Sequence, residues 1–120
     1  MHWNILAQNL CRGFEKIDDH APILRFSNRL RLIKQHLEEV DADIIGLVEI
    51  DALCGEFSNC ARDLCTFMQG LGYAFSTYDK LDQKSGSAIF YKKHLFTMIK
   101  SEFRALSFDG SSQFLMHCQF

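Results

Sequence analysis

Hydrophobic and polar positions follow two different periods along the chain, which predicts an alternation of strands and helices. In HWNILAQ, residues 2–8, apolar and polar side chains alternate with a period of two, which is typical of a strand. Apolar residues then recur every third or fourth position from Ser27, the expected N-cap, to Val40, which predicts an amphipathic helix. The apolar run at Ile44–Ile50 predicts a buried strand.

The second half of the chain is predicted to contain one helix followed by several strands. Ser58 or Asn59 is the expected cap of the helix, which ends at GLGY, where Gly70 or Gly72 can adopt the left-handed cap conformation. The later segments are YAFSTY (73–78, strand), SAIFYK (87–92, strand), LFTMIKSEFRAL (95–106, equally typical of helix and strand) and FLMHCQF (114–120, strand). This order predicts a layered α/β domain rather than a barrel of strict repeats.

The composition is that of a single globular domain without an overall affinity for nucleic acid. The 120 residues are 48% apolar and 23% charged, which is enough to bury one core. The formal net charge is −2, so the chain has no basic field that would attract nucleic acid. Any contact with phosphate must therefore be local or made through a metal ion.

Cysteine spacing and hydropathy indicate the expected compartment. The five cysteines show neither a Cys-x-x-Cys pair nor another zinc-binding spacing, which predicts free thiols in a reducing environment. No apolar run reaches the roughly 18 residues that a membrane span requires, and no charged segment followed by an apolar leader opens the chain. We therefore expect an intracellular, cytoplasmic protein with no membrane partner.

Two polar residues interrupt predicted strands and are the candidate functional residues. Glu49 stands inside an apolar run, although a buried carboxylate without a partner is strongly unfavourable. Asn4 stands in the first strand, and asparagine is depleted from strands. A structural explanation is that Asn4 bonds to neighbouring backbone and that Glu49 reaches solvent or pairs with an arginine. A functional one is that Glu49 binds a hard cation such as Mg²⁺ while Asn4 donates to a phosphate oxygen, and the spacing leaves both open.

Four segments in series resemble one known family. WNILAQNL, RLRLIKQHLEEVDADIIGLVEID, LGYAFSTYDK and GSAIFYKKHLF are similar to the endonuclease/exonuclease/phosphatase superfamily, and within it to the deadenylase-type branch that includes nocturnin, Angel and the exonuclease subunits of the main deadenylase complex. The resemblance covers nearly all 120 residues in the family's order. It implies an α/β fold that is half of a four-layer α/β-β/α sandwich, a mixed β-sheet with helices on one face.

The resemblance also implies roles for individual residues. Glu49 matches the family's metal-binding glutamate, and Asn4 matches the asparagine that helps to hold the scissile phosphate. Lys80 matches a lysine that lines the substrate cleft in some members, and a solvated loop lysine is the equally good alternative. Arg29 matches a helix arginine with a structural role, and Gly86 matches a glycine at a tight turn or a close backbone approach. The implied cofactor is Mg²⁺ or Mn²⁺, held weakly because a single carboxylate with water ligands binds such an ion poorly.

The sequence departs from the family pattern at several positions. Val48 replaces a glutamine before the glutamate, and Ser85 replaces an aspartate before the glycine. The family's Thr-His, Gly-Asp-Phe-Asn and Ser-Asp-His segments, which carry the general base and the catalytic histidine, have no counterpart before Phe120. DDH at 18–20 belongs to no matching motif, and His117 is expected to be a packed or half-exposed strand histidine.

These features together predict that residues 1–120 are the amino-terminal part of a single catalytic domain whose carboxy-terminal half is absent. An abrupt start and an abrupt end at strands favour a truncated chain. The implied function is a Mg²⁺-dependent phosphodiesterase of deadenylase type, which is an exoribonuclease on poly(A), or a nocturnin-like phosphatase, with little or no activity as an isolated chain. The alternatives are a non-catalytic nucleotide- or protein-binding module and a purely structural sandwich in which Glu49 is salt-bridged.

The partners implied by the resemblance are RNA, in particular poly(A), or a phosphorylated nucleotide. Half of a face-to-face sandwich would leave one face of its sheet uncovered. Such an apolar surface is expected to drive homodimerisation or pairing with a complementing second half.

Overall fold

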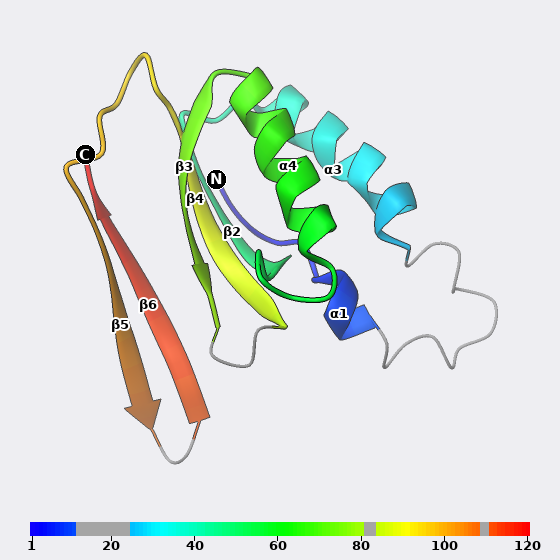
Figure 1. Cartoon of the computed structure of the whole chain (residues 1–120). Coiled ribbons are helices and arrows are strands. Elements are labelled where there is room, and N and C mark those ends of the chain that lie inside the picture. Colours follow the sequence, from blue (N-terminus) through cyan, green and yellow to red (C-terminus); the bar gives the residue numbers. More distant parts are fainter. Residues whose placement is uncertain (12–24, 81–83, 109–110) are drawn as a thin grey trace.

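A four-stranded mixed sheet lies at the centre of the molecule, with helices on one face and a β-hairpin on the other (Figure 1). The computed structural model describes residues 1–11, 25–80, 84–108 and 111–120, and the side chains within 105–114 are not among those described. The elements are, in chain order, β1 (His2–Asn4), α1 (Gln8–Cys11), α3 (Phe26–Val40), β2 (Ile44–Asp51), α4 (Ser58–Gly70), β3 (Tyr73–Asp79), β4 (Ser85–Lys92), β5 (Lys100–Phe108) and β6 (Ser111–Gln119). This arrangement confirms the predicted mixed sheet with helices on one face.

The order of the strands brings three strand ends to one edge of the sheet. The order is β1-β2-β4-β3, with β1 parallel to β2 and with β4 antiparallel to both β2 and β3. β1, β2 and β3 therefore run in the same direction and end where β4 begins. We call this the strand-end edge; its polar residues include Asn4, Glu49, Asp51, Asp79 and Lys80.

The helices cover one face of the sheet because their apolar residues recur at helical spacing. The buried residues that form this core are Ile5, Phe26, Ile33, Leu37, Ile45, Leu47, Ile50, Leu64, Cys65, Met68, Tyr73, Ala88 and Phe90. The structure thus confirms the two predicted helices, α3 and α4, and the predicted strand β2, each of which contributes buried residues to this core. Within the described ranges, no helix has the length and apolar character that crossing a membrane requires.

The first strand is shorter than the sequence predicts. It ends at Asn4, because Leu6 has a φ of 55° and a short helix begins at Gln8. Ile5 and Ala7, which the alternation places on the inner face, are buried even though they lie beyond the strand. The alternation therefore predicted correctly that Ile5 and Ala7 are buried. It was wrong about the end of the strand, which lies at Asn4.

The predicted helix caps are correct at one end only. Ser27 lies inside α3, whose cap position is occupied by Arg25 without a side-chain cap hydrogen bond. Ser58 and Asn59 lie inside α4, which also begins without a side-chain cap hydrogen bond. These predictions were wrong because each residue already has helical geometry. Gly72 has a φ of 88°, which confirms the expected left-handed glycine after α4.

The hairpin of β5 and β6 packs on the sheet face opposite the helices (Figure 1). The segment that was ambiguous between helix and strand is extended from Lys100 onward. The hydroxyl groups of Ser76 and Ser101 are 2.9 Å apart, and the ring of Tyr78 stacks on Phe103 with 4.4 Å between centroids. These contacts join β3 to the hairpin.

Candidate functional site at the strand-end edge

Glu49 is the extra residue of a β-bulge in β2. Val48 pairs with Ser87 and Ile50 pairs with Gly86, which are consecutive residues of β4. Glu49 therefore has no pairing partner on β4. The φ of Glu49 is 55°, in the left-handed region that favours glycine. Bulges of this kind redirect a side chain and are frequent beside active sites. Glu49 therefore leaves the regular alternation of the strand, which explains how a carboxylate fits into an apolar segment.

The Glu49 carboxylate has the properties of a ligand for a hard cation. The side chain is half-buried, and among the residues that the structure describes it has neither a hydrogen bond nor an ion pair. Mg²⁺ binds one or two protein carboxylates and retains several water ligands, so this single carboxylate fits Mg²⁺ or Mn²⁺. The described part of the chain contains no group of three His, Cys, Asp or Glu side chains placed to hold a metal.

Asn4 lies next to Glu49 in the parallel pairing of β1 and β2. Asn4 pairs with Val48, the residue before Glu49. The backbone N–H of Leu6 donates to Oδ1 of Asn4 at 2.9 Å. Because only the oxygen of a side-chain amide accepts hydrogen bonds, the oxygen of Asn4 faces Leu6 and the nitrogen faces away from it. The side chain is exposed, and its amide nitrogen has no partner among the described residues. The oxygen thus bonds to neighbouring backbone, and the amide N–H groups remain available to an anion.

Arg29 connects α3 to the turn after β1. Its Nη1 donates to the carbonyl oxygen of Ile5 at 3.0 Å and to that of Leu6 at 2.7 Å. Its Nε and Nη2 are buried and have no partner among the described residues. These contacts are to main-chain oxygens, so Arg29 acts on the shape of the turn.

Asp51 is a residue of this edge to which the sequence assigned no role. Its two carboxylate oxygens accept the backbone N–H groups of Gln8 and Asn9, each at 3.0 Å, at the start of α1. The first N–H groups of a helix lack partners within the helix, and they favour a negative charge. Burial raises the pKa of the Asp51 carboxyl, and the bonds from Asn9 and Gln8 and the charge of Arg29 oppose that rise.

Lys80 lies at the same edge but is not brought into contact with Glu49. It follows β3, which is separated from β2 by β4, so two strand spacings, roughly 10 Å, lie between these strands. Its backbone N–H donates to the carbonyl oxygen of Ser85 at 2.9 Å, and its side chain is half-buried. The structure thus places Asn4 and Glu49 on neighbouring strands, whereas Lys80 follows a strand that lies farther away.

Asp79 and Gly86 shape the edge between β3 and β4. Asp79 accepts the backbone N–H groups of Leu53 and Cys54 at 3.0 and 3.3 Å and the Cys54 thiol at 3.2 Å. It therefore ties the loop after β2 to the end of β3. A Cβ on Gly86 would lie 2.4 Å from the carbonyl oxygen of Tyr78, which confirms the close backbone approach expected at this glycine.

Of the other positions singled out in the sequence, Val48 and Ser85 lie on the strands of this edge, and His117 lies on the hairpin. His117 lies in strand β6 with an exposed side chain, so it is not packed in the core. Val48 lines a groove on the hairpin side, and Ser85 is buried opposite Asp51 in the pairing of β2 and β4. The DDH motif at 18–20 lies outside the described residues.

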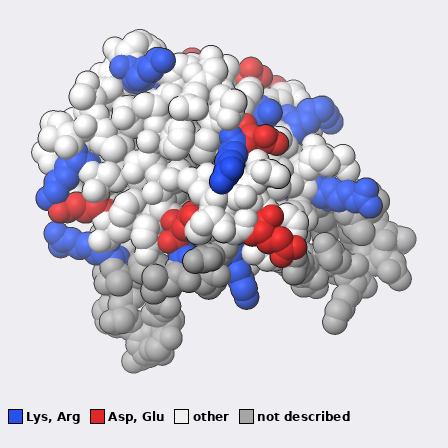
Figure 2. All heavy atoms as spheres, in the orientation of Figure 1, with Lys and Arg blue, Asp and Glu red and all other residues white. Residues whose placement is uncertain are grey.

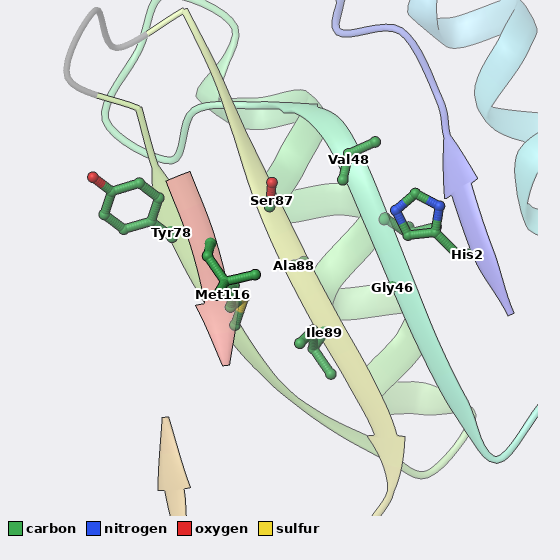
Figure 3. A pocket seen from close by; sticks show the side chains of 10 residues that line it. His2, Gly46, Val48, Tyr78, Ser87, Ala88, Ile89 and Met116 are labelled. Atoms are coloured by element: carbon green, nitrogen blue, oxygen red, sulfur yellow. The ribbon is translucent and has the colours of Figure 1, made fainter. Parts of the chain in front are cut away.

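A groove of about 270 Å³ lies between the sheet and β6 (Figure 3). Its lining is mainly apolar and includes His2, Val48, Tyr78, Ile89, Leu115 and Met116. Figure 3 shows side chains of β1, β2, β4 and β3 along one wall and Met116 of β6 on the other. The hairpin therefore covers only part of this face of the sheet.

A mixed sheet with helices on one face defines the class of the protein as a layered α/β domain. The chain belongs to the Endonuclease/Exonuclease/phosphatase family, whose model matches residues 1–111. The resemblance of the sequence motifs is thereby confirmed.

Solved structures of the same fold include ANGEL2 and Nocturnin. The chain is similar to ANGEL2, described as a 2′,3′-cyclic phosphatase (TM-score 0.73, 21% identity, 91% of this chain and 31% of that one). It is also similar to ANGEL2 in complex with adenosine-2′,3′-vanadate (0.73, 19%, 99% and 36%) and to the human Nocturnin catalytic domain with bound sulfate (0.62, 23%, 88% and 36%). The chain thus spans about a third of the length of these structures. No match is found among curated proteins.

Proposed function

We propose that this chain supplies the metal-binding carboxylate and a phosphate donor of a phosphoesterase that acts on nucleotides or RNA ends. The observation that carries the proposal is Glu49, which a bulge with a positive φ removes from the regular strand. Its carboxylate has no partner among the described residues, and Asn4 lies on the neighbouring strand, paired with the residue before Glu49. Membership of the family supports phosphate esters as the substrate class. The ANGEL2 complex with adenosine-2′,3′-vanadate supports an RNA-type nucleotide as the substrate.

Each residue of the edge would contribute differently to phosphate binding. Glu49 would hold Mg²⁺ or Mn²⁺, and the bound ion supplies positive charge that stabilises a phosphate and its transition state. Asn4 would donate its amide N–H groups to a phosphate oxygen. Lys80, farther along the same edge, would contact a more distant phosphate of an extended substrate. Basic and acidic side chains are interspersed on the face that Figure 2 shows, so recognition would depend on these local donors.

The finer proposal is a deadenylase-type exoribonuclease on poly(A) or a nocturnin-like phosphatase, with weak or no turnover by these 120 residues alone. The chain spans about a third of the solved structures that share its fold. General acid–base groups typically contribute about 100- to 10,000-fold to the rate, so a chain without them would turn over slowly. We therefore expect binding of metal and nucleotide to be easier to measure than hydrolysis.

The decisive experiment is titration calorimetry with Mn²⁺ or Mg²⁺ in the presence of adenosine monophosphate. We expect the wild-type chain to bind the ion and Glu49→Gln to lose that binding. Glu38→Gln, at an exposed position of α3, is the matched control and should bind like the wild type. Absence of binding in the wild-type chain, or equal binding by Glu49→Gln, would overturn the proposal.

A non-catalytic nucleotide- or protein-binding module is the second candidate. The mainly apolar groove between the sheet and β6 favours it, because such a surface can accept a base or a partner side chain without a metal. In that case nucleotide binding would be independent of divalent ions and of Glu49. The same calorimetric series with a metal chelator separates the two functions.

A further inference from the structure

Side chains hold the backbone between β1 and α1, in addition to the main-chain hydrogen bond from the N–H of Ile5 to the carbonyl oxygen of Val48 at 3.1 Å. Oδ1 of Asn4 accepts the N–H of Leu6, and Arg29 donates to the carbonyl oxygens of Ile5 and Leu6. Leu6 has a positive φ, and a residue with a Cβ keeps that conformation only where its surroundings impose it. The direction in which the chain leaves β1 therefore depends on a guanidinium group from α3.

Asp51, at the end of β2, holds the other end of this segment, at the start of α1. It accepts the N–H groups of Gln8 and Asn9, and only 2% of its surface is exposed. Asp51 follows Glu49 by two residues on the same strand, so a second metal-binding carboxylate is the obvious assignment. The geometry argues against that assignment, because each oxygen already accepts a backbone N–H inside the fold.

We infer that Arg29 and Asp51 are positioning residues that clamp residues 5–9, so that Asn4 presents its amide N–H groups beside Glu49. The roles of Asn4 and Glu49 in this inference rest on the proposed function, whereas the clamp follows from the hydrogen bonds alone. Asn4 uses its oxygen within the clamp, and the clamp thereby determines which side-chain atoms remain for a phosphate.

Two conservative variants test the clamp. Asp51→Asn replaces one acceptor oxygen by an N–H₂ group that faces backbone donors, and Arg29→Lys keeps the charge but loses the planar donor geometry. Asp63→Asn and Arg31→Lys, at exposed positions of α4 and α3, are the matched controls. Each variant is compared with the wild-type chain by ¹H–¹⁵N nuclear magnetic resonance without metal and by Mn²⁺ titration with adenosine monophosphate.

Without metal, we expect the amides of Leu6, Gln8 and Asn9 to exchange faster with solvent and the Asn4 side-chain signals to shift. The amides of β4 should be unchanged, which shows that the variants are folded. With metal and nucleotide, we expect affinity to fall by about 10- to 100-fold, as is typical when an outer-shell partner is removed. The control variants should behave like the wild type. If Asp51→Asn does not fold, Arg29→Lys carries the test.

Unchanged exchange and unchanged Asn4 signals in both variants would overturn the clamp. Faster exchange together with wild-type affinity for metal and nucleotide would overturn the positioning role and leave a purely structural contact. A wild-type chain that binds neither ion nor nucleotide would overturn the proposed function instead. In that case the exchange rates and the Asn4 signals alone would show whether Arg29 and Asp51 hold residues 5–9 in place.

Discussion

Glu49 combines an unfavourable backbone conformation with a half-buried carboxylate that has no partner in the described chain. The left-handed conformation costs a residue with a Cβ about 1–2 kcal/mol, and such strain is concentrated at functional sites. Glycine would avoid this cost at the bulge. The presence of glutamate there favours a role for its side chain rather than for the backbone alone.

We predict that Glu49→Gly is more stable than Glu49→Ala by about 1 kcal/mol, because only glycine adopts the bulge conformation without strain. Both variants lose the carboxylate, so the comparison isolates the backbone. Urea unfolding of the two variants measures the difference in the free energy of unfolding. Equal stabilities would show that residue 49 does not keep a positive φ in solution.

Cys54 offers a measurable report on the carboxylate of Asp79. The thiol is exposed, and its hydrogen bond to Asp79 raises its pKa above the ordinary value. The thiolate is the reactive form, so Asp79→Asn should lower this pKa and increase alkylation of Cys54 at pH 8 severalfold. At any pH below the thiol pKa the variant should react faster, and the difference should vanish above the pKa of both proteins.

Mass spectrometry after timed alkylation gives the rate at each cysteine. Cys65 is the internal control, because burial raises its pKa to about 11 without a contribution from Asp79. Its rate should be the same in both proteins. An unchanged rate at Cys54 would contradict the hydrogen bond to Asp79.

At this scale the sequence revealed Glu49 and Asn4, because each is a polar residue that breaks an apolar pattern. Asp51 and Arg29 gave no such signal, since an acid at a strand end and an arginine on a helix are both compatible with solvent exposure. Their partners are main-chain groups 23 to 43 positions away. A pattern of side chains does not record hydrogen bonds to distant main chain, so the roles of these two residues required the structure.

At the scale of elements, periodicity located α3, α4 and β2 because burying one face requires that spacing. The end of β1 could not be predicted, because it is set by the contacts of Leu6 with Asn4 and Arg29. The four residues of α1 are too few to show a period. β5 was ambiguous in sequence because pairing with β6 decides its conformation.

The close approach of β3 and β4 requires glycine at position 86, because glycine has no Cβ. A Cβ there would lie 2.4 Å from a backbone oxygen of the neighbouring strand, so Gly86→Ala must displace one strand. We expect a loss of about 1–3 kcal/mol in the free energy of unfolding, the usual cost of overpacking. Gly70→Ala is the control, because no atom lies within 4 Å of its added Cβ.

Gly70 is the last residue of α4, where alanine favours the helix, so we expect the control variant to be as stable as the wild type or slightly more stable. Urea unfolding of both variants provides the comparison. Equal effects of the two substitutions would contradict the close approach of β3 and β4 at Gly86.

At the scale of the whole molecule, the sheet face that the hairpin leaves partly open provides an apolar surface. The groove there is lined mainly by apolar side chains, and Leu115 at its rim is 50% exposed. We predict that the chain associates with itself through this surface and that Ile89→Lys, in the groove, weakens the association. Leu32→Lys, which replaces an exposed leucine of α3 on the opposite side of the sheet, should leave it unchanged.

Sedimentation equilibrium over a range of protein concentrations measures this association directly. A wild-type chain that stays a monodisperse monomer would contradict the prediction. So would a variant series in which Leu32→Lys, and not Ile89→Lys, abolishes association.

The pairing of β1 with β2 has a consequence for the order in which the chain folds. β3 and β4 are joined by a short connection, whereas β1 reaches β2 only after the whole segment that contains α1 and α3 has been closed into a loop. Closing a longer loop costs more entropy, and contacts between distant segments form later. The three residues of β1 should therefore join last and open first. Any ion or phosphate that bridged Glu49 and Asn4 would shift this local equilibrium towards the closed strand, so that ligand binding would complete the folding of its own site.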